Sequence, residues 1–455
     1  MLVLGQSSHL DINWHVTFDT YYETLVEPIL VDATQLLDAE PAAYYAVAEM
    51  AFVAEHLARH DGERWRRHAA SGRMRVVGGA MTTPDTLLTT GETLARDYLL
   101  GSLVAERELG VRTRTAWLPD SFGHAPTVPD VLAAAGYTAV GFGRADGARH
   151  AYEVQVDGLE PIAPGVDSTA AMLRDLGSAD FVWRGPGGGE VLAHYMPVRQ
   201  YCHGDAIDLD GVTFAGTRLG VEHDDDPGFV RDRIAGFIAE LTPYQRTPYL
   251  FVPVGCDFQR PRPRLVEYAR WWNEERFEAT GVWVAVATFE DYVRLVGFHR
   301  DALPALARDI TPVWTGFYAS RPRIKRVARA AAEALAGVEP FLAFVRPGSE
   351  ALAPAWHDVV LSNHHDWITG TSTDAVTADE QLPRLEAALA VADGAWRDVL
   401  DALAARVDTL DLPAGVAVTV VNPGPVERTD VVELDAALTG PLVARAGATR
   451  SPAQV

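Results

Sequence analysis

The sequence predicts an α/β fold in which helices wrap a parallel sheet or barrel, followed by a helical segment. Two observations predict it. Short β-rich runs alternate with amphipathic helical patterns up to about residue 300, and such runs disappear from about 301 to 411. Alternating strands and helices are typical of parallel sheets, whose functional side chains lie at the carboxyl ends of the strands. Polar residues that directly follow a strand are therefore the candidates for function.

The predicted strands before residue 300 include "MRVVGG", "TAWLPD", "TAVGFG", "YLFVPVG" and "VWVAVAT". Amphipathic helical patterns lie between them, such as the stretch from Pro41 to His68. A helix entered through Pro129 follows "WLPD", because proline is favoured in the first turn of a helix. The Gly-rich "RGPGGGE" at 184–190 predicts a hairpin turn rather than a phosphate loop, since no Lys-Ser/Thr pair follows it.

Ala/Leu/Arg-rich stretches dominate residues 301–411. "IKRVARAAAEALAGVEPFLAF" and "LPRLEAALAVADGAWRDVLDALAARV" carry amphipathic helical patterns and predict a helical bundle. After "LDLPAG", the run "VAVTVVNPGPVERTDVVEL" predicts two strands joined by a turn at Asn-Pro-Gly-Pro. We therefore expect an α/β domain at 1–300, a helical domain at 301–411 and the truncated start of a β-domain at 412–455.

Composition narrows the class of partner. The chain has 455 residues, of which 48% are hydrophobic and 22% charged, as in folded globular proteins. No apolar run approaches the roughly 18 residues of a membrane span, so we expect no membrane partner. The formal net charge of −23 argues against nucleic acid, because that partner needs clustered Lys and Arg.

The cysteines and the N-terminus favour a cytoplasmic protein. The only two cysteines, Cys202 and Cys256, do not make a disulfide framework. Met1 is not followed by a basic segment and an apolar signal core. We therefore expect reduced thiols and a cytoplasmic location.

The segment "SSHLDINWH" places His9 and Asp11 close to a tryptophan. If "LVLGQSSHLD" is a strand running out of a sheet, these two side chains point the same way, because strand residues two apart share a face. An imidazole and a carboxylate would then converge as two ligands of one metal ion. The alternative is a helix N-cap aspartate beside a solvated histidine.

Two more carboxylates follow predicted strands. Asp120 ends the strand in "WLPD", and Asp257 follows the apolar strand in "YLFVPVGCDF". Both would lie at the edge of the sheet where ligands bind. The alternatives are a helix N-cap for Asp120 and a loop-capping carboxylate for Asp257.

The fourth polar segment is "LSNHHDWITGTSTD", which brings two adjacent histidines and an aspartate together. A solvated polar loop is the alternative interpretation. Together the four segments supply two or three imidazoles and four carboxylates, which suits a divalent ion such as zinc. They also supply the pair of carboxylates that glycoside hydrolysis uses.

The chain resembles the α-mannosidases of glycoside hydrolase family 38 from the N-terminus to the start of the last β-rich segment. "SSHLDINWHVTFDTYYE" is similar to the opening His-x-Asp segment of that family, and "TPDTLLTTGETLARDYLLG" to the segment that follows its Gly-Gly. "WLPDSFGHAPTVPDVLAAAGY" resembles its nucleophile segment. "FVWRGPGGGEVLAHYMP", "VGCDF" and "NHHDWITGTS" resemble three later stretches, in the same order.

The resemblance implies a zinc-dependent retaining α-mannosidase that acts through a covalent glycosyl-aspartate intermediate. It also implies a (β/α)7 catalytic barrel, a three-helix bundle and the beginning of a β-sandwich domain. The expected substrate is an α-mannoside or a mannose-containing oligosaccharide, and a homo-oligomer is compatible with the sequence.

Carried over residue by residue, the resemblance implies roles for individual side chains. One Zn²⁺ ion would be held by four residues, namely His9, Asp11, Asp120 and His365, while His364 is not expected to be a ligand. Asp120 would also be the nucleophile, and Asp257 the general acid/base. The sugar pocket would be shaped by Trp14, Phe122, Arg144, Tyr201 and Asp366.

Some positions depart from the family pattern. Where the family usually has a tryptophan, a glutamate and an asparagine, this chain has Met81, Thr83 and Leu87. These three differences bear on which glycan the protein prefers more than on the mechanism. Two other functions stay open: an inactive sugar-binding relative, and a metal-dependent polysaccharide deacetylase, which would not explain a ligand on the helical domain.

Overall fold

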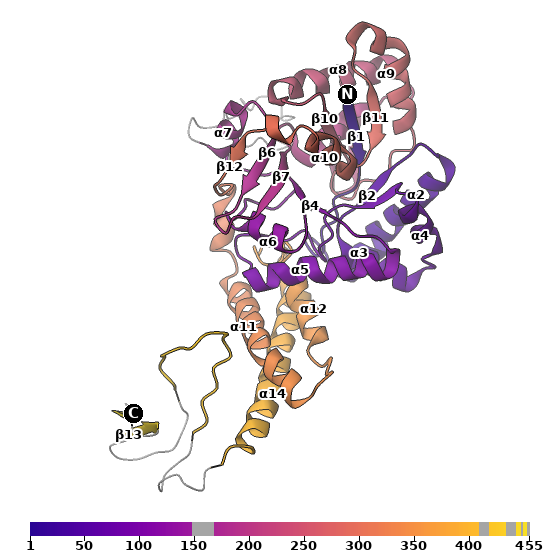
Figure 1. The fold of residues 1–455 in the computed structure, drawn as a ribbon. Helices are drawn as coiled ribbons and strands as arrows, with labels where there is room; N and C mark the ends of the chain where they lie inside the picture. Colours follow the sequence, from indigo (N-terminus) through magenta and orange to yellow (C-terminus); the bar gives the residue numbers. More distant parts are fainter. Residues whose placement is uncertain (148–167, 409–417, 434–442, 447–448, 453–455) are drawn as a thin grey trace. The chain divides into compact units, whose positions relative to one another are not determined.

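The computed structural model describes residues 1–147, 168–408, 418–433, 443–446 and 449–452 (Figure 1). The chain divides into two compact units. The first comprises Met1–Ala336 and Glu350–Gly394, and the second comprises Gly337–Ser349 and Ala395–Val455.

The first strand lies at the centre of a parallel sheet. Strand β1 (Leu2–Gln6) pairs with β10 (Leu250–Val254) on one side and with β11 (Val284–Ala287) on the other. Every residue of β1 and β10 is buried, which explains why the sequences of both strands are nearly continuous apolar runs.

Helices cover both faces of this sheet, because successive side chains of a strand point to opposite faces. Leu2 and Leu4 pack in one core cluster with side chains of α8 (Pro227–Leu241) and α9 (Leu265–Thr280). Val3 packs in another cluster, which contains residues of α10 (Phe289–Gly297). Each fully buried large apolar side chain contributes about 1.5–3 kcal/mol to folding.

A second, five-stranded sheet has the order β12-β6-β7-β5-β4. Its members are β4 (Thr115–Leu118), β5 (Ala139–Phe142), β6 (Asp180–Arg184), β7 (Glu190–Tyr195) and β12 (Ala305–Leu306). All pairs are parallel except β6 with β7. Between these two strands, the Gly185 amide donates to the Gly189 carbonyl over 2.9 Å, which confirms the hairpin turn predicted at 184–190.

Two smaller sheets complete the strands of the first unit. In one, β2 (Tyr45–Val47) is parallel to β3 (Met74–Val76), and in the other β8 (Leu209–Phe214) is antiparallel to β9 (Thr217–Glu222). The parallel strands alternate with helices, as predicted. Within the described residues the parallel strands belong to three separate hydrogen-bonded sheets, so a closed (β/α)7 barrel is not confirmed.

The other α-helices of the first unit are α1 (Phe18–Tyr21), α2 (Glu27–Ala39), α3 (Met50–Arg59), α4 (Glu63–Ala70), α5 (Gly91–Val104), α6 (Val128–Ala134), α7 (Thr169–Asp175), α12 (Ala353–Leu361) and α13 (Asp374–Val376). Short 3-10 and π-helical segments are η1 (Tyr22–Val26), η2 (Ala105–Leu109), η3 (Gln200–Asp208), η4 (Thr242–Tyr244), η5 (Arg300–Ala302), η6 (Thr315–Tyr318) and η7 (Thr377–Gln381). Pro129 stands in the first turn of α6, as predicted. The helical prediction for Pro41 to His68 is wrong at its start, because β2 occupies Tyr45–Val47 there.

The two long predicted helices are present as α11 (Pro322–Val345) and α14 (Leu382–Ala404). A three-helix bundle is not confirmed, and the domain boundaries at 300 and 411 stay predictions. The structure also places β12, paired to β6, inside the stretch expected to lack strands. No helix of the described residues is long and apolar enough to cross a membrane.

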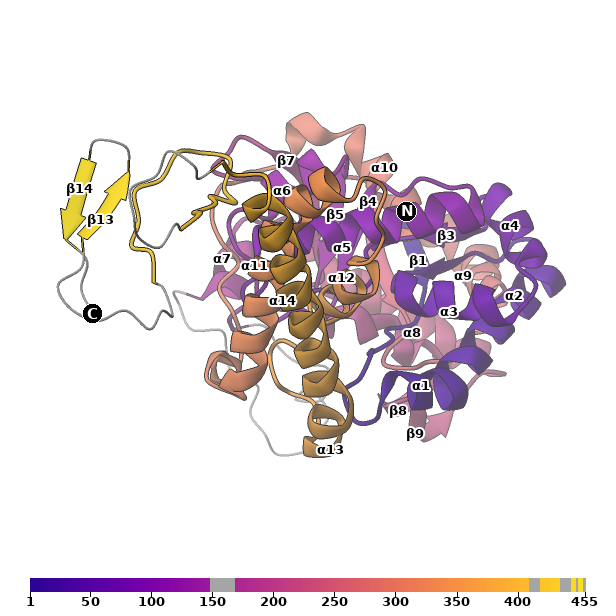
Figure 2. The same cartoon turned by 90° about the horizontal axis from the view of Figure 1, so that it is seen from below.

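Strands predicted around Asn-Pro-Gly-Pro are wrong for residues 418–433, which contain no strand in the described structure. A local turn is present, in which the Gly424 amide donates to Oδ1 of Asn422 over 3.0 Å. Val426 and Val431 there are 65% and 83% exposed, so no packed sheet face stabilises a strand. Further on, β13 (Val443–Ala446) and β14 (Thr449–Pro452) form an antiparallel pair (Figure 2).

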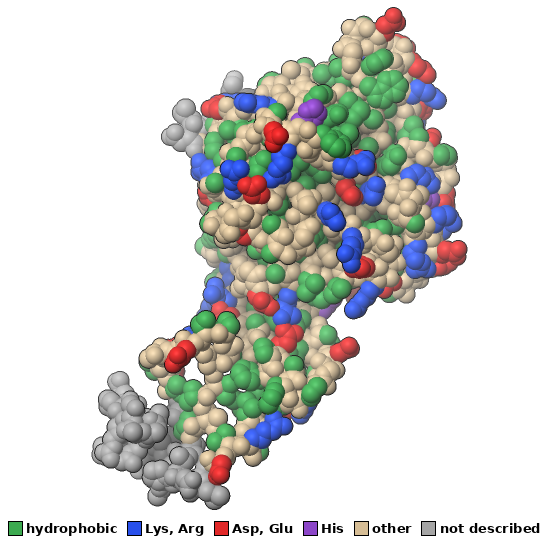
Figure 3. All heavy atoms as spheres, viewed as in Figure 1, with side chains coloured by type: hydrophobic (Ala, Val, Ile, Leu, Met, Phe, Trp, Pro, Cys, Tyr) green, Lys and Arg blue, Asp and Glu red, His purple; other side chains and the backbone are tan. Residues whose placement is uncertain are grey.

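The expectation of reduced thiols is wrong, because the structure joins Cys202 and Cys256 in a disulfide. They are 54 residues apart in sequence, and the fold brings η3 beside the end of β10. The cytoplasmic location stays a prediction. On the face shown in Figure 3, acidic and basic side chains of the described residues are interspersed, with no continuous basic band.

Candidate metal and catalytic site

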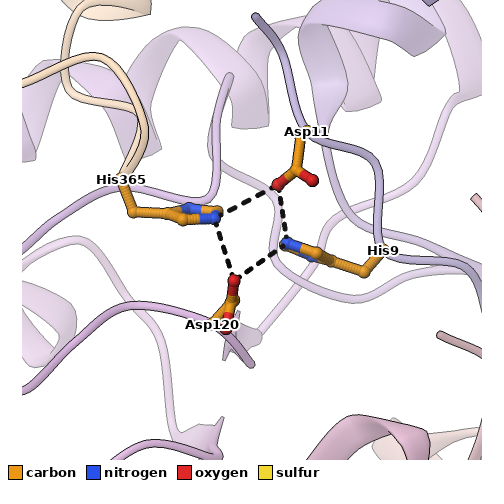
Figure 4. Close-up of side chains that lie close together, drawn as sticks. All are labelled: His9, Asp11, Asp120 and His365. Carbon is orange, nitrogen blue, oxygen red and sulfur yellow. Dashed lines mark ion pairs between the residues drawn. The ribbon is translucent and has the colours of Figure 1, made fainter. Parts of the chain in front are cut away.

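Four side chains from three distant segments converge on one point (Figure 4). His9 and Asp11 follow β1, Asp120 follows β4, and His365 follows α12. Oδ1 of Asp11 lies 3.0 Å from Nε2 of His9 and 3.3 Å from Nε2 of His365. Oδ2 of Asp120 lies 3.9 Å and 3.6 Å from the same two nitrogens.

The backbone beyond β1 explains why His9 lies at this point. The strand ends at Gln6, earlier than the sequence predicted, yet its pairing with the β10 segment continues. The His9 amide donates to the Cys256 carbonyl over 3.2 Å, and the Phe258 amide donates to the His9 carbonyl over 2.9 Å. His9 therefore lies directly beside Asp257.

This close approach requires a glycine. Gly255 has a φ of 147°, and a Cβ at that position would lie 1.9 Å from the Ser7 carbonyl oxygen. Any side chain there would push the two segments apart.

The His365 ring is oriented by a backbone carbonyl. Its Nδ1 lies 2.8 Å from the Thr83 carbonyl oxygen, which can only accept, so Nδ1 carries the hydrogen. Nε2 of the ring therefore faces Asp11 and Asp120 with a lone pair when the ring is neutral. The outer ring nitrogen of His9, Nδ1, lies 3.7 Å from Oε1 of Glu49, beyond hydrogen-bond distance.

Glu49 and Thr83 lie beside the outer ring nitrogens of the two histidines. Oγ1 of Thr83 donates to Oε1 of Glu49 over 2.7 Å, while the Thr83 carbonyl accepts from His365. Both side chains are buried. Sequence reasoning did not single out Glu49, and it treated Thr83 only as a departure from the family pattern. The one available signal for Glu49 was a carboxylate following a short β-rich run.

The cluster attracts positive charge. Burial opposes a charged His9, but Asp11 overcomes it and raises the pKa of His9 to about 9. Burial likewise opposes a charged His365, yet Asp366 and Asp11 raise its pKa well above the ordinary value. Two carboxylates and two imidazoles that favour a cation are the mixed nitrogen/oxygen set that suits a divalent metal ion.

Buried polar atoms in the cluster fit such an ion. Among the described residues, nothing gives a hydrogen bond of acceptable geometry to Nε2 of His9, Nε2 of His365 or Oδ1 of Asp11. An unsatisfied buried polar atom costs about 1–3 kcal/mol. Three such atoms aimed at one point are explained by a cation that all of them would bind.

Asp120 uses its two oxygens differently. Oδ2 faces the histidines, whereas Oδ1 is in contact with Nε of Arg144. Burial would raise the pKa of Asp120, but Arg144 and then His365 hold it well below its ordinary range. Asp120 is therefore an anion at any physiological pH.

Asp257 has the opposite character. The Tyr201 hydroxyl donates to Oδ1 of Asp257 over 2.9 Å, and both side chains are buried. Burial, followed by the charge of Asp11, raises the pKa of Asp257 to about 6. One site therefore contains a carboxylate held ionised and another that holds a proton near neutral pH, which is the division of roles that glycoside hydrolysis requires.

The remaining predicted pocket residues surround this centre. Oδ1 of Asp366 accepts from Thr371 over 2.6 Å, and burial together with Asp11 raises the pKa of Asp366 to about 8. The Phe122 ring is buried, with its centroid 5.9 Å from that of His365. Trp14 is half-buried, and its ring centroid lies 6.5 Å from that of Phe214.

Comparison with protein families gives two matches along the chain. Residues 2–316 match the N-terminal domain of glycosyl hydrolases family 38, and residues 312–403 match the α-mannosidase middle domain. Alpha-mannosidase 2x of Mus musculus is 26% identical over 427 residues, covering 82% of this chain and 36% of its own length. Alpha-mannosidase 2 of Drosophila melanogaster is 25% identical over 428 residues, covering 84% of this chain and 37% of its own.

Solved structures show the same fold. The crystal structure of an alpha-mannosidase from Enterococcus faecalis V583 superposes with a TM-score of 0.72 at 17% identity, covering 91% of this chain and 44% of that one. A second Enterococcus faecalis protein of glycosyl hydrolase family 38 gives 0.62 at 16% identity, covering 91% of this chain and 41% of that one. This chain thus spans less than half the length of these relatives.

Proposed function

The chain belongs to glycosyl hydrolase family 38, and we propose that it is a zinc-dependent retaining α-mannosidase acting on terminal α-mannosides. The observation that carries this proposal is the pair of buried carboxylates with opposite pKa shifts, Asp120 and Asp257, beside a four-residue metal cluster. Retaining glycosidases use two such carboxyl groups about 5 Å apart on either side of the scissile bond.

Asp120 would be the nucleophile. Its carboxylate attacks the anomeric carbon, and the bond from that carbon to the leaving oxygen breaks, which gives a covalent glycosyl-aspartate. Arg144 supports this role because its guanidinium contacts Oδ1 and favours the ionised carboxylate. A nucleophile that stays ionised needs no separate base to activate it.

Asp257 would be the general acid/base. It gives its proton to the leaving oxygen in the first step, and in the second it removes a proton from the water that attacks the anomeric carbon and releases Asp120. A pKa of about 6 suits both directions of transfer near neutral pH. The Tyr201 hydroxyl would orient Asp257, since it donates to the carboxylate.

Four residues would hold the zinc ion, because one possible ligand atom from each lies within 4.8 Å of the others, namely from His9, Asp11, Asp120 and His365. When bound, the ion would supply positive charge that keeps Asp120 ionised and coordination positions for sugar hydroxyls. Trp14 and Phe122 would give the sugar apolar contacts, while Asp366 would accept or donate hydrogen bonds to its hydroxyls.

Two alternatives have less support. An inactive sugar-binding relative would not need both carboxylates and all four cluster residues, which are present together here. A polysaccharide deacetylase would not explain why His365, from the mainly helical part of the chain, completes the cluster.

The test is release of a chromogenic phenol from an aryl α-mannoside, compared with the matching α-glucoside and β-mannoside. The proposal expects zinc-dependent hydrolysis of the α-mannoside, lost on chelation and restored by added zinc. Asp120→Asn serves as the matched control, since it keeps the shape of the side chain and removes the nucleophile. Hydrolysis of the α-mannoside by zinc-free protein at the full rate would contradict the proposal.

A further inference from the structure

The disulfide joins the immediate neighbours of two hydrogen-bonded site residues. Tyr201 precedes Cys202, and Asp257 follows Cys256. The Tyr201 hydroxyl donates to Asp257, and the S–S bond links the two backbones one residue away from that contact. The Cα atoms of the cysteines are 4.6 Å apart. Hydrogen bond and disulfide thus hold the same two segments together.

Both segments have a backbone that needs such support. Arg199 and Gln200, directly before Tyr201, have φ values of 48° and 51°. Phe258, directly after Asp257, has a φ of 53°. Left-handed backbone is unfavourable for residues with a side chain and persists only where the surrounding structure enforces it. A covalent link between the two segments restricts their relaxation to ordinary conformations.

Two of the four cluster residues are held by contacts outside the linked segments. The metal cluster draws on His365 and Asp120, whose positions are set by Thr83 and Arg144. His9 is the cluster residue that meets the linked segments: its amide donates to the Cys256 carbonyl, and its ring centroid lies 4.9 Å from that of Tyr201. Loss of the S–S bond therefore acts first on the Tyr201–Asp257 pair.

We propose that Cys202 and Cys256 are positioning residues for the general acid/base, and that their disulfide holds the Tyr201 hydroxyl on Asp257. This rests on the proposed α-mannosidase function. Cleaving the bond weakens proton transfer to the leaving oxygen and leaves the nucleophile and the metal cluster in place. Hydrolysis of mannosides with poor leaving groups is accordingly sensitive to reduction of this one bond.

The redox step is simple. A dithiol reductant gives two electrons to the S–S bond, which breaks, and the reductant closes into its own disulfide. Its two protons end on Cys202 and Cys256 as thiols. Both cysteines are buried, with 8% and 1% of their surface exposed, so reduction is expected to be slow in the folded protein.

The experiment compares the wild type with the double variant Cys202→Ser/Cys256→Ser on two substrates, methyl α-mannoside and 2,4-dinitrophenyl α-mannoside. General acid catalysis contributes about 10²–10⁴-fold, so we expect a loss of kcat of at least about tenfold on the methyl substrate and less than about twofold on the activated one. Zinc content should be unchanged. An equal loss on both substrates would indicate a merely structural bond and would overturn the proposal.

Tyr201→Phe is the matched comparison, because it removes the hydrogen bond and keeps the disulfide. The same dependence on the leaving group is expected, and adding the two serines in that background should cost little more, since both changes act on one contact. Full additivity of the two effects would contradict the proposal.

If the double variant does not fold, the folded wild-type protein is used instead. Its disulfide is reduced, the free thiols are counted, and the protein is then reoxidised. Selective loss on methyl α-mannoside that reverses on reoxidation supports the proposal. Two reactive thiols in the untreated, unfolded wild type would overturn it, because the disulfide would be absent. If the wild-type protein hydrolyses neither substrate, the proposed α-mannosidase function is wrong. This outcome is distinguishable from the absence of the disulfide, because the thiols are counted in a separate measurement.

Discussion

The carbonyl of Thr83 accepts a hydrogen bond of 2.8 Å from Nδ1 of His365, while the hydroxyl of the same residue donates to Glu49 over 2.7 Å. Glu49 in turn lies 3.7 Å from Nδ1 of His9. One threonine thus hydrogen-bonds to His365 and to Glu49, a buried carboxylate that faces Nδ1 of His9. Groups behind metal-binding histidines fix the tautomer and the orientation of the ring.

We therefore predict that Glu49→Gln weakens zinc binding about 10–100-fold, the usual effect of losing such an outer partner. Calorimetric titration of the metal-free protein with zinc measures it. Glu55→Gln is the matched control, since Glu55 lies in α3, the helix that begins directly after Glu49, and pairs with Arg59 instead. Equal affinities for Glu49→Gln and Glu55→Gln would show that Glu49 does not support the metal.

Loss of a direct ligand should reduce zinc binding more than loss of a residue that lies behind a ligand. His365→Ala is predicted to abolish stoichiometric zinc, because it removes one of four converging donors. Elemental analysis after gel filtration measures the metal, and exposed His357→Ala provides a control from the preceding helix. Retention of one zinc per chain by His365→Ala would refute the proposed ligand set.

The acid/base role of Asp257 predicts a dependence on the leaving group. Asp257→Asn should lower kcat/KM for alkyl α-mannosides by about 10²–10⁴-fold and for activated aryl α-mannosides far less, because a stable leaving group needs no proton. Steady-state kinetics on both substrates measure this. A uniform loss would mean that Asp257 has another role.

The pH profile follows from the same residue. Burial and Asp11 raise the pKa of Asp257 to about 6, and the acid must be protonated to act. On alkyl α-mannosides, kcat/KM should therefore be highest below that pH and fall as pH rises through it, approaching about tenfold per pH unit. Asp257→Asn should lack this descending limb. A limb that persists in the variant would belong to a different group.

Much of the site could be predicted from sequence because its residues sit in short ordered motifs. His9 with Asp11, and Asp120 after "WLP", directly follow apolar strands, so their place at the end of a strand is a local property. Glu49 could not be found in that way. Its contacts with His9 and Thr83 depend on how β2 and the segment after β3 pack, and no local pattern encodes that packing.

The same distinction explains the errors in the fold. The long helices α11 and α14 have strong helical periodicity and were predicted correctly. Strand β2 has three residues, all buried, within a helical pattern, so tertiary pairing with β3 overrides the local preference. The disulfide joins residues 54 positions apart, and only the fold shows that they meet.

Trapping the glycosyl-enzyme would test the proposed mechanism most directly. An activated fluorinated α-mannoside that slows the second step should leave its sugar on the nucleophile, and mass spectrometry of the digested protein should place it on Asp120. We predict one label per chain on the peptide containing Asp120, and no label on Asp120→Asn. A label on any other residue, or full hydrolysis by Asp120→Asn, would contradict it.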